Sequence, residues 1–241
     1  MKIIYDFDGT LTKYPLPQYP ILQNVGGTEE VIQEHAKKIL PKCNSFYEAY
    51  YMAYKEILEE HNICLTKENI CLGAKDTKFN KGVLEYFEKF KSSKANIQHY
   101  IVTSGIKYYV EETEISDYIE KIYGVTLKEE DGIYKEVDYV LTDKKKVDVI
   151  KEIIKDIIKD IKNNEEVVYI GDGLTDKYAF EYVHNIGGKT IFVVLDEKSK
   201  IIFEQLNKEG IINKCFDADF SDDSRMSKYI ESLYKSEMKQ D

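Results

Sequence analysis

Short apolar runs alternate with amphipathic stretches along most of this chain. The runs are typical of buried strands and cover residues 3–5, 97–103, 167–170, 190–195 and, more briefly, 215–216. Most of them are separated by stretches in which apolar residues recur at helical spacing, most regularly over 147–161. Strands that alternate with helices predict a parallel sheet with helices on both faces. We therefore expect an α/β fold.

The part of the chain between the second and third runs departs from simple alternation. A helix is predicted near 107–121. A β-hairpin is predicted between 122 and 142, because Asp131-Gly132 is a typical turn pair between strand-like segments. After residue 195, the pattern predicts a helix, the short strand near 215–216 and a terminal helix.

A helical insert is predicted at residues 14–79. Three of the four prolines fall within 14–20, which must be extended and cannot continue a strand–helix unit. Thr28 can cap a first helix, with Glu29 in its first turn, and further helices are predicted at 44–61 and 67–72. We expect the proline-bearing segment to be the hinge of this insert.

Polar motifs follow three of the predicted strands. Asp6 and Asp8 are expected to leave the first strand on the same side. Two carboxylates so close together repel each other unless a cation lies between them. Mg²⁺ suits such a place because it prefers oxygen ligands. Similar motifs occupy 103–105 and 171–173. Ligands bind at the carboxyl ends of strands in open parallel sheets, so we expect the three motifs to meet there. The lysine run 144–146 adds a cation, although most of it can simply be a solvated helix start.

Composition limits the partners and the compartment. The 241 residues suit one large domain or a core with a smaller insert, and 43% hydrophobic residues are enough for a core. A net charge of −10 disfavours nucleic acid and anionic membranes as partners. The four cysteines have neither CxxC nor zinc-like spacing. We expect a cytoplasmic protein without a signal peptide, either a monomer or a homodimer.

Four motifs in order along the chain resemble those of the haloacid dehalogenase superfamily, in its phosphoserine-phosphatase-like branch. They are DFDGT at 6–10, VTSG at 102–105, a lysine at the start of a helix, and GDGLTD at 171–176. The resemblance implies a Rossmann-like three-layer core with a parallel sheet, made of residues 1–13 and 80–241. It also implies that residues 14–79 form a small α-helical cap, inserted after the first strand.

The resemblance also implies a catalytic mechanism. Asp6 is the expected nucleophile, which forms an aspartyl-phosphate, and Asp8 the expected general acid and base. Mg²⁺ would be held by the Asp6 carboxylate, the Asp8 carbonyl and the Asp172 carboxylate. An acid at position 8 favours phosphate esters over carbon–halogen bonds, because a halide leaves without a proton.

Two motif positions leave a choice between neighbours. Ser104 is the expected hydrogen-bond donor to the phosphoryl group, with Thr103 as the alternative. Lys146 is the expected cation between nucleophile and phosphoryl group, with Lys145 as the alternative.

The remaining motif residues have supporting roles by the same resemblance. Asp176 would support the metal shell through water or orient the lysine. Gly9, Thr10 and Gly105 are expected to bind the phosphate, with Thr10 offering its hydroxyl group.

The sequence thus predicts a Mg²⁺-dependent phosphatase for a small phosphorylated metabolite. Two alternatives are a phosphotransferase or phosphomutase of the same superfamily and a non-catalytic binding protein with this fold. Residues 14–79 contain no arginine, which puts a phosphoserine-type carboxylate clamp in doubt. They contain six tyrosines, which either pack the cap or line a pocket for a sugar or base: Tyr14, Tyr19, Tyr47, Tyr50, Tyr51 and Tyr54.

Overall fold

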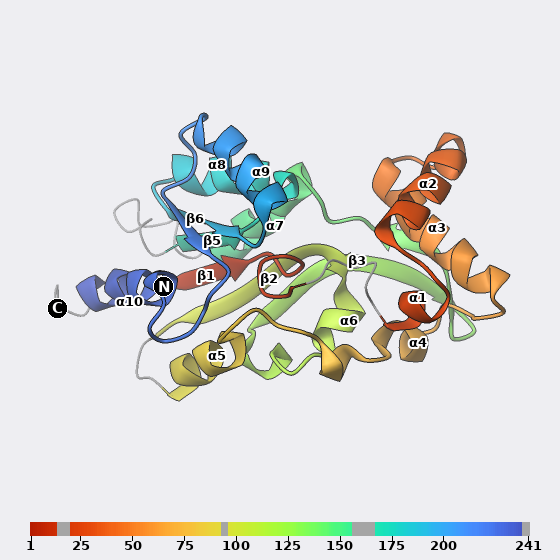
Figure 1. Cartoon of the computed structure of the whole chain (residues 1–241), viewed down its shortest axis with the longest axis horizontal. Coiled ribbons are helices and arrows are strands. Elements are labelled where there is room, and N and C mark those ends of the chain that lie inside the picture. Colours follow the sequence, from red (N-terminus) through yellow and green to blue (C-terminus); the bar gives the residue numbers. More distant parts are fainter. Residues whose placement is uncertain (14–19, 93–95, 156–166, 238–241) are drawn as a thin grey trace.

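A seven-stranded sheet forms the centre of the protein in the computed structural model, which describes residues 1–13, 20–92, 96–155 and 167–237 (Figure 1). The strand order is β4-β3-β2-β1-β5-β6-β7, and all neighbours are parallel except β3 and β4. This is the predicted α/β fold with a mostly parallel sheet. The strands are β1 (Lys2–Tyr5), β2 (Gln98–Ile106), β3 (Lys121–Glu130), β4 (Ile133–Tyr139), β5 (Val167–Gly171), β6 (Lys189–Val194) and β7 (Lys214–Asp217).

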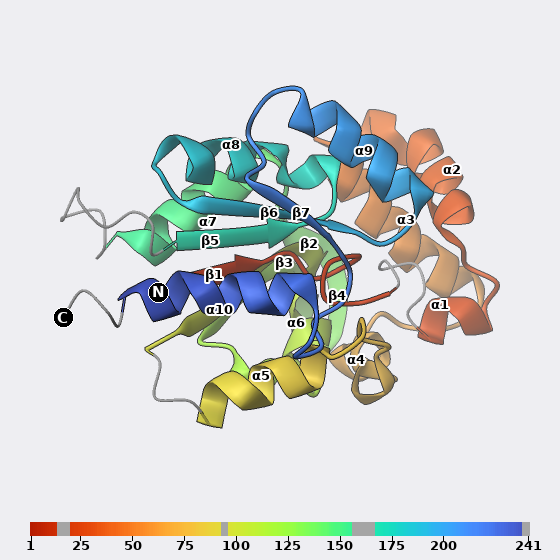
Figure 2. The same cartoon turned by 60° about the vertical axis from the view of Figure 1, so that its left-hand side comes forward.

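Helices cover both faces of the sheet, as Figures 1 and 2 show. One face carries α7 (Lys144–Ile154), α8 (Lys177–Asn185) and α9 (Glu197–Asn207), and the other carries α5 (Val83–Ser92), α6 (Lys107–Glu111) and α10 (Arg225–Glu237). Side chains of a strand point alternately to the two faces. Accordingly Ile3 and Tyr5 pack in one hydrophobic cluster and Ile4 in the other.

The helices predicted for the insert are present and lie together beyond the end of β1 (Figure 1). They are α2 (Glu29–Ile39), α3 (Phe46–Glu60) and α4 (Lys67–Cys71), and a short helix that was not predicted, α1 (Pro20–Asn24), precedes them. Thr28 caps α2 as predicted, and Ser45 caps α3 by accepting from the Glu48 amide. The predicted hinge lies largely in 14–19, outside the described residues.

The predicted hairpin is also present, formed by β3 and β4. Its turn residues Asp131 and Gly132 both have a positive φ, which this tight turn requires. The hairpin contacts the insert, since the Tyr134 amide donates to the Leu65 carbonyl at 2.8 Å.

The prediction of a long helix near 107–121 is wrong. Helix α6 ends at Glu111, and a 3-10 turn, Ser116–Tyr118, follows before β3 begins at Lys121. The Thr113 hydroxyl donates to the Val110 carbonyl at 2.7 Å and takes an acceptor that a longer helix would need for its own backbone. Three glutamates, at 111, 112 and 114, also oppose the negative end of a helix there.

Two further boundaries differ from the prediction. Strand β2 continues through Ser104 to Ile106, with an irregular register against β3 after Val102. Helix α7 begins at Lys144, and the predicted part beyond residue 155 lies outside the described residues.

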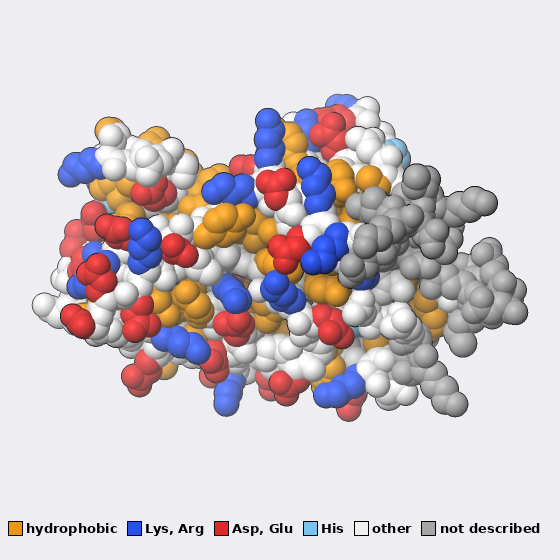
Figure 3. All heavy atoms as spheres, turned by 180° about the vertical axis from the view of Figure 1, so that it is seen from behind, with side chains coloured by type: hydrophobic (Ala, Val, Ile, Leu, Met, Phe, Trp, Pro, Cys, Tyr) orange, Lys and Arg blue, Asp and Glu red, His pale blue; other side chains and the backbone are white. Residues whose placement is uncertain are grey.

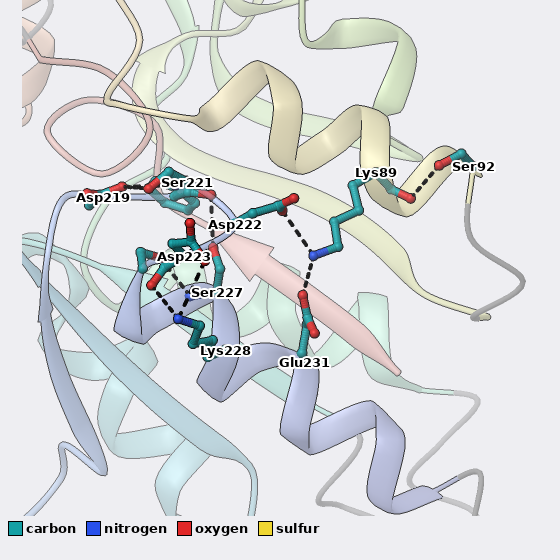
Figure 4. Close-up of polar contacts among 11 residues, drawn as sticks. Lys89, Ser92, Asp219, Ser221, Asp222, Asp223, Ser227, Lys228 and Glu231 are labelled. Carbon is teal, nitrogen blue, oxygen red and sulfur yellow. Dashed lines mark hydrogen bonds and ion pairs between the residues drawn. The ribbon is translucent and has the colours of Figure 1, made fainter.

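Helix α10 is tied to α5 by a polar network (Figure 4). Lys89 of α5 donates to Asp222 at 3.0 Å and also to Glu231 of α10.

On the face seen from behind, acidic and basic side chains are interspersed (Figure 3). Among the described residues, no helix is long and apolar enough to cross a membrane.

Candidate active site

Three polar motifs meet at the carboxyl edge of the central strands. In the register of the sheet, Tyr5 lies opposite Ile101 on one side and Ile170 on the other. The Asp6 amide continues the ladder by donating to the Ile170 carbonyl at 2.9 Å. The residues that follow β1 and β5 therefore leave the sheet side by side, with the 103–105 segment of β2 at the same edge.

Lys146 supplies a buried positive charge to this edge. Its ammonium nitrogen lies 3.2 Å from Asp6 Oδ1 and 2.7 Å from Asp176 Oδ1, and the side chain has no exposed surface. The two preceding lysines are exposed, with Lys144 over the Tyr178 ring and Lys145 over the Tyr139 ring. Of the three lysines, Lys146 is the one beside Asp6.

Asp176 binds both the lysine and the loop that carries Asp172. Its Oδ1 accepts from Lys146 Nζ at 2.7 Å and from the Tyr169 hydroxyl at 2.6 Å. Its Oδ2 accepts from the amides of Asp172, at 3.2 Å, and Gly173, at 3.1 Å. With four donors, this buried carboxylate orients the lysine and fixes the start of the loop.

Thr10 and Gly9 both lie directly against the Asp172 side chain. The Thr10 hydroxyl, which we expected to face phosphate, donates to Asp172 Oδ1 at 2.7 Å. Gly9 has φ +82°, and a Cβ there would lie 2.3 Å from Asp172 Oδ2. Only glycine lets the turn after β1 approach Asp172 this closely.

Ser104 and Thr103 differ in how their hydroxyl groups are used. Thr103 is fully buried, and its Oγ1 accepts from the Gly105 amide at 2.9 Å. Ser104 Oγ is buried and has no hydrogen-bond partner among the residues that the structure describes. The Ser104 carbonyl accepts from the hydroxyl of Tyr51 on α3. The Ser104 hydroxyl thus differs from that of Thr103 in having no partner within the described part of the chain.

The carboxylates at this edge destabilise one another's charges. Burial and the charge of Asp176 raise the pKa of Asp6 to about 6, against the opposing effect of Lys146. Desolvation and the charge of Asp6 raise the pKa of Asp8 to about 8. Burial and Asp6 raise the pKa of Asp172 well above its usual range. Burial opposes the charge of Lys146, but Asp176 and Asp6 hold its pKa above the usual value.

This donor set fits a divalent cation. Asp6, Asp172 and Asp176 each place a carboxylate oxygen within 4.8 Å of the others. Because Asp176 already accepts four hydrogen bonds, Asp6 and Asp172 are the carboxylates left for an ion. The raised pKa values of Asp6 and Asp172 show that their ionised forms are unfavourable here without a further cation, and Mg²⁺, with its preference for oxygen ligands, would stabilise both carboxylates.

Tyr169 is the residue at this site that the sequence did not single out. It lies within an apolar strand, where a tyrosine is usually a core residue packed by its ring. One feature of the sequence could have identified Tyr169. A buried hydroxyl group needs a hydrogen-bond partner, and this strand leads directly into a polar motif that can supply one.

Comparison with known proteins gives a family match and similar folds. Residues 3–181 match the model of haloacid dehalogenase-like hydrolases. An uncharacterized protein from Borreliella burgdorferi is 24% identical over an alignment that covers 87% of this chain and 89% of that protein.

Two solved structures of phosphoserine phosphatase have a similar fold. A substrate-bound complex is 20% identical with a TM-score of 0.61, and the match covers 89% of this chain and 91% of that one. A phospho-aspartyl intermediate analogue is 19% identical with a TM-score of 0.62, over 96% of this chain and 97% of that one. At this level of identity the likeness concerns the fold.

Proposed function

The chain belongs to the haloacid dehalogenase-like hydrolase family, and we propose that it is a Mg²⁺-dependent phosphatase that hydrolyses a small phosphomonoester through an aspartyl-phosphate. The observation that carries the proposal is the fully buried ammonium group of Lys146, 3.2 Å from Asp6 and 2.7 Å from Asp176. A fixed cation beside a carboxylate nucleophile is suited to hold an anionic phosphoryl group for attack.

Asp6 and Asp8 have unequal roles in this proposal. The Asp6 carboxylate attacks phosphorus, the bond from phosphorus to the ester oxygen breaks, and Asp8 donates its proton to the leaving alkoxide. Asp8 then removes a proton from the water that attacks the aspartyl-phosphate and releases inorganic phosphate. The raised pKa of Asp8, about 8, supports this role because it keeps the acid protonated near neutral pH.

The carboxylates of Asp6 and Asp172 and the carbonyl of Asp8 would hold the metal ion. When bound, Mg²⁺ supplies positive charge that offsets the repulsion between nucleophile and phosphate. Thr10 orients Asp172 through its 2.7 Å hydrogen bond, and Asp176 orients Lys146.

Phosphoryl oxygens would be bound by the unpartnered Ser104 hydroxyl and by the backbone amide of Gly9. The Gly105 amide, which we expected to bind phosphate, instead donates to Thr103 Oγ1 at 2.9 Å. Ser104 is favoured over Thr103 because its buried Oγ has no hydrogen-bond partner among the described residues, whereas Thr103 Oγ1 is held by the Gly105 amide. In the same proposal, residues 14–79 are a cap domain on a core of 1–13 and 80–241. The hydrogen bond from Tyr51 to the Ser104 carbonyl supports this, since it joins α3 to the phosphate-binding segment.

The direct test is release of phosphate from p-nitrophenyl phosphate. We expect activity with millimolar Mg²⁺, loss of activity with EDTA, and recovery when Mg²⁺ is restored. Absence of activity toward a broad panel of phosphomonoesters with Mg²⁺ present would contradict the proposal.

A further inference from the structure

A buried asparagine, Asn80, lies where the chain returns from the helical insert to the sheet. Its side chain Nδ2 donates to the Thr10 carbonyl at 2.9 Å and to the Thr12 carbonyl at 3.1 Å. Its backbone amide donates to the Leu11 carbonyl, which lies between these two in the sequence, at 2.8 Å. One residue thus binds three successive carbonyls of the turn that follows β1.

These contacts fix the part of the turn that faces Asp172. A carbonyl oxygen only accepts hydrogen bonds, so three adjacent carbonyls need three donors, which the side chain and the backbone of one asparagine supply. The middle one of the three bound residues is flanked by Thr10, whose hydroxyl donates to Asp172 Oδ1 at 2.7 Å. Rotation of the Thr10 backbone would break the bond to Asn80 and move this hydroxyl away from Asp172.

Asn80 is held in place by the chain before it. Phe79 forms an antiparallel bridge with Thr12, and the Lys13 amide donates to the Lys78 carbonyl at 3.0 Å. The two segments that connect the insert to the sheet are therefore paired with each other directly beside Asn80.

The chain after Asn80 is held from a second side, by the loop between β7 and α10. Lys81 forms a parallel bridge with Asp219, and the Phe220 amide donates to the Lys81 carbonyl at 2.7 Å. The Asp219 carboxylate in turn accepts from the Ser221 amide at 2.9 Å (Figure 4). Because both of its neighbours are bound, Asn80 is a fixed support for the turn after β1.

From this arrangement we infer that Asn80 is a positioning residue of the proposed metal site, which acts on Asp172 through Thr10. The inference rests on the proposed function, in which Asp172 holds Mg²⁺. Two hydrogen bonds connect Asn80 to this carboxylate, from Nδ2 to the Thr10 carbonyl and from the Thr10 hydroxyl to Asp172 Oδ1. Residues that orient metal ligands from outside the coordination shell increase the affinity for the metal.

A purely structural role is the alternative, in which Asn80 only stabilises the junction between the insert and the sheet. Both roles predict a lower melting temperature when the side chain is removed, because two buried carbonyls lose their donor. They differ in metal binding. A contact that does not act on Asp172 leaves the affinity of the folded protein for Mg²⁺ unchanged.

Calorimetric titration of Mg²⁺ into the substrate-free protein separates the two roles. In Asn80→Ala we expect the dissociation constant for Mg²⁺ to rise roughly fivefold. Asn69→Ala is the matched control, since Asn69 Nδ2 also donates to a backbone carbonyl, that of Cys64 at 2.8 Å, within the insert. The control should stay within about twofold of the wild type. Equal dissociation constants in Asn80→Ala and the wild type would overturn the inference.

A double variant tests whether the effect passes through Thr10. Thr10→Val already lacks the hydroxyl that binds Asp172, so adding Asn80→Ala to it should raise the dissociation constant by less than about twofold more. If the two substitutions instead multiply their separate effects, Asn80 acts independently of Thr10 and the inference is wrong.

Hydrogen exchange in the unsubstituted protein tests the coupling even if Asn80→Ala does not fold. Coupling between two sites is reciprocal, so Mg²⁺ held by Asp172 should strengthen the contacts between Asn80 and the turn. Adding Mg²⁺ should then slow amide exchange over residues 78–82 as well as 9–13, and leave residues 67–71 of α4 unchanged. Unchanged exchange over 78–82 would contradict the coupling.

Failure of the inference is distinguishable from failure of the proposed function. If the wild type binds Mg²⁺ and hydrolyses p-nitrophenyl phosphate while Asn80→Ala binds Mg²⁺ equally well, only the role of Asn80 is overturned. If the wild type neither binds Mg²⁺ nor hydrolyses any ester, the phosphatase proposal fails, and the inference about Asn80 fails with it.

Discussion

Tyr169 of β5 and Asp176, in the 3-10 turn that follows this strand, form a 2.6 Å hydrogen bond at the oxygen that also accepts Lys146. Both side chains are fully buried, and the Tyr169 ring packs edge-on against Phe180 with centroids 5.3 Å apart. The tyrosine thus contacts the candidate active site from the core of the protein, through the carboxylate that also binds Lys146.

Replacing Tyr169 with Phe keeps the ring and removes this donor. We expect kcat to fall about 10- to 100-fold with a small change in KM, because the orientation of Asp176, and through it that of Lys146, is lost. The free energy of unfolding should fall by about 1–3 kcal/mol, since a hydrogen bond to a charged group is removed. Steady-state kinetics and urea unfolding measure the two effects. Tyr182→Phe on α8 is the control, and an unchanged kcat in Tyr169→Phe would show that the contact is only structural.

Thr10 should govern the affinity for Mg²⁺ through Asp172. In Thr10→Val the 2.7 Å hydrogen bond is absent while the shape is kept, so the Asp172 carboxylate can rotate. We expect the Mg²⁺ concentration for half-maximal activity to rise about tenfold. The increase in melting temperature with Mg²⁺ should shrink in parallel. Thr10→Ser keeps the donor and should restore both values; loss of Mg²⁺ affinity in Thr10→Ser equal to that in Thr10→Val would contradict this explanation.

The two candidate lysines should differ sharply on substitution. Lys146→Ala removes the buried cation beside Asp6 and should lower kcat by about 10²- to 10³-fold. Lys145→Ala removes an exposed side chain that lies over Tyr139 and should stay within about twofold of the wild type. Comparable losses in the two variants would mean that the geometry has been assigned to the wrong lysine.

His99 provides a prediction about stability that is independent of catalysis. It is buried among aromatic rings, and its Nδ1 lies 2.9 Å from the Tyr5 hydroxyl, which is also 2.8 Å from the Tyr86 hydroxyl. Burial lowers the pKa of His99 to about 4, against an unfolded value near 6.5. Below pH 6.5 the unfolded chain therefore binds a proton that the folded protein does not.

Stability should consequently fall as the pH drops from 6.5 toward 4, by about 3 kcal/mol from this one group. The raised pKa values of Asp6 and Asp8 act in the opposite sense, so the effect is seen in a comparison of variants. His99→Asn keeps a polar partner for Tyr5 and should flatten this part of the pH dependence in urea unfolding. His61→Asn, at an exposed histidine, should keep the wild-type dependence; an unchanged dependence in His99→Asn would exclude His99 as its source.

Much of the fold follows from local patterns. The central strands were predicted because parallel strands buried on both faces are continuous apolar runs. Helix α2 was predicted because Thr28 and the charges at both helix ends agree with its apolar spacing. The helix near 107–121 was wrong because the Thr113 side chain competes for the backbone carbonyl of Val110, an effect that spacing does not reveal.

The sequence predicts which motifs form the candidate site, but not the contacts that their side chains make with one another. Asp6, Lys146 and Asp172 belong to short signatures at strand or helix ends, and the sheet brings these ends together. The partners of Asp176 and Thr10 depend on side-chain directions across strands, which linear spacing does not fix. Tyr169 was missed for that reason, and the Thr10 hydroxyl was assigned to phosphate when it binds Asp172.

The most direct test of the proposed phosphatase mechanism is to trap the covalent intermediate on Asp6. An acyl phosphate is reduced by borohydride, which converts the aspartate to homoserine, and peptide mass spectrometry then locates the changed residue. We expect homoserine at position 6 when the protein is quenched during turnover with Mg²⁺ and a phosphomonoester, and none without substrate. Homoserine at another aspartate, or undiminished turnover in Asp6→Asn, would contradict it.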